Sequence, residues 1–102
     1  MKKKVEEALI ELGVYPNLTG FNYICRAVEI ISESKEKMKI VDGLYVDVAK
    51  EFNSTKSKVE RAIRHAITKM DKDSETYKKY VGTKDKTNSV VLYTLAFRLK
   101  ED

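Results

Sequence analysis

Basic and short polar side chains recur at helical spacing between residues 56 and 70, and they are well suited to bind an anionic partner. At about 100° per residue, one face of a helix here carries Ser57, Lys58, Arg61, Arg64, His65 and Thr68. The segment from Lys56 to Lys72 has a net charge of +4, so the rest of the chain is balanced. Such a localised excess favours an anionic partner such as nucleic acid. The alternative is an ordinary solvated helix face.

This basic face has the chemistry needed to read double-stranded DNA. A helix fits the major groove, where Arg donates two hydrogen bonds to guanine and Glu accepts one from cytosine. Glu60 lies at the edge of the face, where it would repel phosphate, so it indicates base reading or orientation of Arg64 four residues later. A capping or salt-bridging role for Glu60 is the alternative. His65 is the only histidine and is either a DNA contact or a surface residue.

The sequence lacks the residue groups that enzymes, metal centres and membrane spans need. One Cys and one His are too few for a zinc cluster, and Cys25 falls on an apolar stripe that predicts a place in the core. It contains no Gly-rich phosphate loop and no paired acid and base. No apolar stretch approaches the roughly 20 residues that span a bilayer. We therefore expect a soluble, cytoplasmic protein that is not an enzyme and uses no metal or cofactor.

The elements that must hold the basic face are predicted to be helices. Hydrophobic residues make up 42% of the 102 residues and charged residues 35%, and the chain has only one Pro and four Gly, which favours helices over a turn-rich β fold. Apolar periodicity predicts helices over 3–12, 21–31, 38–52, 59–70, 74–81 and 91–99, a connection over 14–20, and polar loops over 32–39 and 83–86. The expected fold is a single all-α domain, residues 1–102, of five or six helices.

Residues 44–70 have the proportions of a helix-turn-helix whose second helix covers 56–70. Ala49 is small at the point where the two helices would cross closely. Asn53 tolerates the left-handed conformation that the turn can need. Val59 would lock the second helix onto the first. We therefore predict a recognition helix whose DNA-binding residues are Ser57, Lys58, Glu60, Arg61, Arg64, His65 and Thr68.

The same segment resembles a known family. Residues 44–67 (LYVDVAKEFNSTKSKVERAIRHAI) are similar to the C-terminal effector domain of stage zero sporulation protein A, a response regulator of endospore formation. The most specific part is VERAIRHAI at 59–67. Weaker similarity covers Leu12 to Pro16, Gly20 to Tyr23, Ala27-Val28 and Lys86 to Ser89. The matching runs follow the family order over most of the chain, which a generic helix-turn-helix would not do.

The resemblance implies a domain of about six helices that binds promoter boxes in double-stranded DNA. It also implies tandem head-to-tail copies on DNA, as a homodimer, and contact with an RNA polymerase sigma factor. Glu60, Arg61, Arg64 and His65 match recognition-helix positions that touch DNA in the family, and Lys58 stands where the family usually has Arg. A chain of 102 residues leaves no room for the family's receiver domain. A nonspecific nucleic-acid binder and a protein-interaction module or antagonist of the same fold stay open as other functions.

Overall fold

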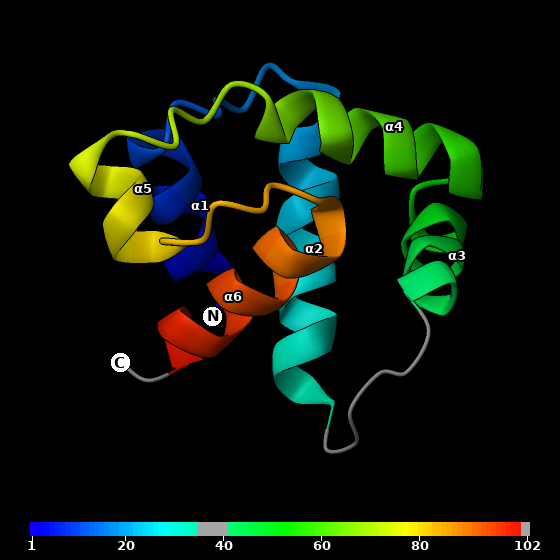
Figure 1. Cartoon of the computed structure of the whole chain (residues 1–102). Coiled ribbons are helices and arrows are strands. Elements are labelled where there is room, and N and C mark those ends of the chain that lie inside the picture. The colour runs from blue at the N-terminus through cyan, green and yellow to red at the C-terminus, as the bar shows by residue number, and fades with distance from the viewer. Residues whose placement is uncertain (35–40, 101–102) are drawn as a thin grey trace.

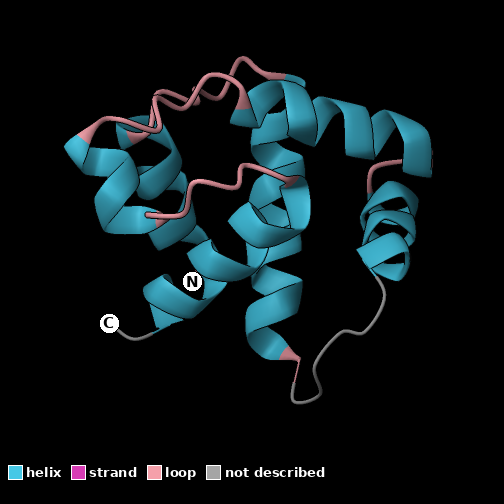
Figure 2. Ribbon diagram, viewed as in Figure 1, coloured by secondary structure: helices cyan, strands magenta, loops and turns pink. Residues whose placement is uncertain are grey.

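The computed structural model describes residues 1–34 and 41–100, and over these residues the chain forms six α-helices and no strand (Figure 2). The helices are α1 (Lys2–Glu11), α2 (Thr19–Glu33), α3 (Val41–Glu51), α4 (Lys56–Ile67), α5 (Glu75–Tyr80) and α6 (Asn88–Lys100). The predicted all-α class is thereby confirmed. Figure 1 shows α4 lying across one end of α2, and α2 contacts α1, α3, α4 and α6.

The core forms around α2, because this helix is apolar over most of its surface. Its buried residues are Gly20, Phe21, Tyr23, Ile24, Cys25, Ala27 and Val28. Leu9 of α1, Leu44 of α3 and Leu92 of α6 are also fully buried in this core. Cys25 is only 2% exposed, which confirms its predicted place. In the part of the chain that the structure describes, no helix is both long and apolar enough to cross a bilayer.

The helix ends follow local backbone and capping rules. Gly13 has φ +93°, a conformation that glycine adopts at little cost, and it directly follows Leu12, the C-cap residue of α1. The backbone amide of Tyr77 donates to the side chain of Ser74, which therefore caps α5. Gly82 has φ +73° shortly after the end of α5. These ends set the directions in which the chain leaves each helix.

Some predicted boundaries were wrong. The polar residues Ser32 and Glu33 were assigned to a loop over 32–39, but α2 continues through Glu33, and residues 35–40 lie outside the described part. The predicted helix over 38–52 is α3, which ends at Glu51; residues 38–40 also lie outside the description. Phe52, the last residue of that predicted helix, follows α3 and is 41% exposed, although its ring makes a T-shaped contact with the ring of Tyr23.

The predicted recognition helix over 56–70 was too long at its C-terminal end. The helix α4 ends at Ile67, and Thr68 is its C-cap residue, with a hydroxyl that donates to the carbonyl oxygen of His65 at 2.5 Å. Met70 lies in the following turn, yet it is only 2% exposed. The apolar pattern therefore continues past the last helical residue, which explains why periodicity overestimated the length.

Candidate DNA-binding interface

A helix-turn-helix is formed by α3, the turn at residues 52–55, and α4. Asn53 has φ +52°, the left-handed conformation predicted for this position, and it is the one non-glycine residue of the described chain with positive φ. The amide of Ser54 donates to the carbonyl oxygen of Ala49 at 2.8 Å, which closes the turn. Ala49 is 5% exposed and Val59 is fully buried, as the predicted close crossing of the two helices requires.

A cap fixes the start of α4. Thr55 is extended, and its Oγ1 accepts a hydrogen bond from the backbone amide of Lys58 at 3.2 Å. This bond satisfies one of the free amides at the helix N-terminus. The inward side of α4 is apolar, with Val59, Ile63, Ala66 and Ile67 buried. The cap and this apolar stripe together determine which side of the helix faces outward.

Two contacts set the position of the motif on α2. A Cβ atom added at Gly20 would lie 2.3 Å from the carbonyl oxygen of Ala62, so α4 approaches the backbone of α2 more closely than any side chain would allow. On α3, Glu51 accepts two hydrogen bonds from Nε of Arg26, at 2.8 and 3.0 Å. The bonded carboxylate of Glu51 raises the pKa of Arg26. The helix α2 therefore contacts both helices of the motif.

The outward side of α4 carries the predicted site residues. Those that are exposed are Ser57, Lys58, Arg61, Arg64, His65 and Thr68. Glu60 is half-buried at the edge of this face. We call these seven residues the α4 face. The structure thus brings together on one surface every residue predicted to bind DNA, although Thr68 lies just past the helix end.

Charges on the α4 face are only partly neutralised. Glu60 pairs with Arg64 one turn later, and 61% of the Arg64 side chain remains exposed. This ion pair is the one expected from the spacing of four residues. Among the residues that the structure describes, neither the ammonium group of Lys58 nor the guanidinium group of Arg61 forms an ion pair or donates a hydrogen bond. Positive charge is therefore available on the α4 face for an anionic partner.

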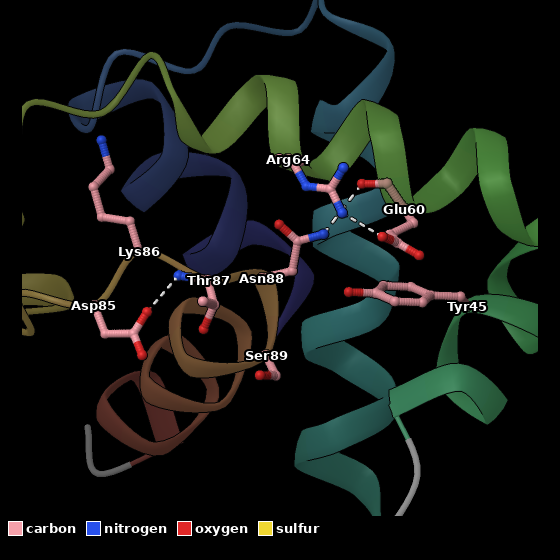
Figure 3. Close-up of a pocket in the computed structure, with 8 residues that line it drawn as sticks. All are labelled: Tyr45, Glu60, Arg64, Asp85, Lys86, Thr87, Asn88 and Ser89. Carbon is pink, nitrogen blue, oxygen red and sulfur yellow. Dashed lines mark hydrogen bonds and ion pairs between the residues drawn. The ribbon is translucent and has the colours of Figure 1, made fainter.

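The α4 face lies between two shallow pockets. One is lined by residues just before and within the first turns of α2 and by residues of the turn and of α4: Asn17, Leu18, Thr19, Gly20, Tyr23, Ser54, Lys58, Arg61, Ala62 and His65. The other is lined by Tyr45, Glu60, Arg64 and residues 85–89, and Figure 3 shows Tyr45, Glu60, Arg64 and Asn88 close to one another, between α3, α4 and the start of α6. The α4 face therefore contributes side chains to both pockets.

Sequence reasoning missed the residues that border the α4 face from other helices. Asn17 and Thr19 fall in the predicted connection over 14–20, although Thr19 begins α2 in the structure. Tyr45 falls in the predicted helix over 38–52, and none of the three was given a role at the site. Asn88 precedes the predicted helix over 91–99 and was given no role at the site, whereas its side chain contacts α4. A pattern within one helix cannot reveal such contacts. The family similarity was the only signal, because Tyr45 lies in the similar run over 44–67 and Asn88 lies in the weaker run from Lys86 to Ser89.

A family model described as "Sporulation initiation factor Spo0A C terminal" matches residues 5–99. The match begins within α1 and ends within α6, so it includes the helix-turn-helix and the α4 face. It confirms the resemblance inferred from the sequence. A single match from α1 to α6 also fits the packing of these helices around α2.

Proposed function

This chain belongs to the Spo0A C-terminal family, a family of DNA-binding domains from a sporulation regulator, and from that premise we propose that it is a sequence-specific transcription regulator. In this proposal α4 enters the major groove of double-stranded DNA. The observation that carries the proposal is the exposure of Arg61 and Arg64 on the outward side of the second helix of a helix-turn-helix. An exposed arginine on such a helix can donate two hydrogen bonds to guanine.

The dimensions of α4 suit this role. Its 12 residues span about 18 Å at 1.5 Å per residue, while the major groove is about 12 Å wide. The helix is therefore long enough to cross the groove. Arg61 lies at the centre of the α4 face, so we assign it to base reading. We assign Lys58, near the N-terminus of α4, to a phosphate contact.

The ion pair between Glu60 and Arg64 supports the orienting role that the sequence left open for Glu60. A carboxylate one turn before an arginine restricts the rotamers of the guanidinium before DNA arrives. In this proposal Glu60 therefore directs Arg64 toward a base edge. His65 and Thr68 contribute contacts at the C-terminal half of the α4 face, and Ser57 does so at its start.

The proposal extends to the partners that the family resemblance implies. We propose that copies of the chain bind head to tail on tandem promoter boxes and contact an RNA polymerase sigma factor. We also propose that the protein acts in the cytoplasm, where it meets DNA. The geometry of a single chain does not test these partners. Experiments on the complex of the protein with promoter DNA and a sigma factor test them.

A selection from random duplex DNA tests the proposal. We expect enrichment of one short motif. On that motif, Arg61→Ala or Arg64→Ala should weaken binding by about 1–3 kcal/mol and relax the base preference at the contacted position. Lys3→Ala is the matched control, because Lys3 is an exposed basic residue in the first turn of α1, a helix that does not pack extensively on α4. This variant should bind the motif like the unmodified chain.

Other results would favour the alternative functions. Steep salt dependence without an enriched motif would indicate a nonspecific nucleic-acid binder. An equal loss of affinity on all sequences in the arginine variants would reduce the α4 face to a phosphate-binding surface. A folded chain that binds no DNA at low salt would indicate a protein-interaction module of the same fold.

A further inference from the structure

One buried polar side chain connects α6 to α4. Asn88, the first residue of α6, is 9% exposed, and apart from tyrosine and cysteine no other polar or charged side chain is buried among the residues that the structure describes. Its Nδ2 donates a hydrogen bond to the carbonyl oxygen of Glu60 at 3.1 Å, across 28 residues of sequence. Figure 3 shows the Asn88 amide lying against α4, next to the ion pair of Glu60 and Arg64.

The segment before α6 is itself held in place. Lys86 donates from Nζ to the carbonyl oxygen of Met70 at 2.7 Å, in the turn just beyond α4. The amide of Thr87 donates to the Asp85 carboxylate at 2.9 Å. The chain around α6's start therefore contacts the α4 region at two points, one within the helix and one after its end.

The contact at Glu60 is well placed to fix α4. A helical carbonyl accepts one hydrogen bond from the amide four residues later and has a second lone pair free. The buried Asn88 amide donates to this second lone pair of the Glu60 carbonyl oxygen. It therefore sets the rotation of α4 about its axis, and its position along that axis, at the residue directly before Arg61. Hydrogen bonds to base edges need donor–acceptor distances within a few tenths of an ångström, so small displacements of the helix matter for base reading.

We propose that Asn88 is a positioning residue for DNA reading, which holds α4 in the orientation that presents Arg61 and Arg64 to the bases. This inference rests on the proposed function. Asn88 itself is buried, so its effect on DNA acts through the backbone of α4. Phosphate contacts tolerate a shifted helix better than base contacts do, because long basic side chains can adjust.

A purely structural role for Asn88 makes a different prediction. If the hydrogen bond only stabilised the fold, its loss would lower the folded fraction, and binding to the selected motif and to random duplex would fall by the same factor. If Asn88 positions α4, affinity for the motif falls more than affinity for random DNA. The ratio of the two affinities separates the two roles.

The experiment compares Asn88→Ala and the unmodified chain on the selected motif and on a random duplex of equal length. Both proteins are first shown to be folded by circular dichroism at the assay temperature. We expect the ratio of motif to random affinity to fall about fivefold to tenfold, roughly the equivalent of one neutral hydrogen bond. Thr94→Ala is the matched control, because Thr94 is a half-buried polar residue of the same helix outside the pocket, and it should leave the ratio unchanged.

Asn88→Asp provides a second variant if the alanine variant does not fold. It keeps the size of the side chain but loses the amide donor, so the ratio should fall as in Asn88→Ala, even though the added negative charge weakens all DNA binding. The unmodified chain could prefer the motif while a folded Asn88 variant keeps the same ratio of motif to random affinity. That result would overturn this inference and leave the proposed function intact. An unmodified chain without sequence preference would overturn both.

Discussion

Replacement of Gly20 by Ala tests the close contact that places the recognition helix on α2. The added Cβ would lie 2.3 Å from the carbonyl oxygen of Ala62 and 2.9 Å from Cβ of Ala66. The first of these atoms is backbone and cannot rotate away. To restore an ordinary contact of 3.4 Å, α2 and α4 must move apart by about 1 Å.

The expected cost follows from overpacking at a buried position. Forcing an extra carbon into a well-packed core typically costs 1–3 kcal/mol, and a clash with backbone belongs at the upper end. The better helix propensity of Ala offsets this by less than about 1 kcal/mol. We therefore expect Gly20→Ala to lower the free energy of unfolding by about 2 kcal/mol. With a urea slope of about 1 kcal/mol/M, the midpoint should fall by roughly 2 M.

Gly43→Ala is the matched control for this prediction. A Cβ at Gly43 in α3 would meet no atom within 4 Å, so only the helix propensity changes. The free energy of unfolding of Gly43→Ala should therefore rise by about 0.5–1 kcal/mol. Urea unfolding followed by circular dichroism measures both variants. If Gly20→Ala proved as stable as the unmodified chain, the tight packing of α4 on α2 would be refuted.

Three further predictions concern a cap, an ion pair and a buried thiol. Thr55→Ala removes the side-chain cap of α4 and should lower the free energy of unfolding by about 1 kcal/mol in the same urea assay; no change would mean that the cap is not formed. Arg26→Ala breaks a partly exposed ion pair with Glu51. The free energy of unfolding should therefore fall by less than about 1 kcal/mol, and by less still in concentrated salt. A larger fall that does not depend on salt would contradict this view. Burial raises the pKa of Cys25 from 9.0 to about 12. The thiol therefore ionises at a lower pH in the unfolded chain than in the folded one, and the free energy of unfolding should fall as the pH rises from 9 toward 12. The fall should be smaller in Cys25→Ala. An equal fall in the variant and the unmodified chain would show that this thiol does not contribute.

Local signals predicted the central motif well. Asn53 was expected to adopt a left-handed conformation, and Ala49 and Val59 were expected at a close crossing, because turn geometry and helix packing restrict the residue types allowed there. Helical periodicity likewise placed the basic residues opposite the buried stripe of α4. These features depend on residues close together in the sequence, so a single chain contains the information.

Helix boundaries and long-range contacts were less accessible. Met70 is buried in a turn, so the apolar period does not mark the end of α4 at Ile67. Ser32 and Glu33 are polar, yet they complete the last turn of α2, since a polar side chain does not by itself stop a helix. The hydrogen bond from Asn88 to Glu60 joins residues with no shared periodicity, and only the folded arrangement of α4 and α6 reveals it.

The central claim is that the α4 face meets DNA, and a nuclear magnetic resonance titration with the selected duplex tests it most directly. Backbone amide signals of the whole chain would be followed as DNA is added. We predict the largest shifts at Arg61, Arg64 and His65, with little change at Lys3 and Lys4 in α1. Large shifts confined to α1, with the signals of α4 unmoved at saturation, would contradict the account.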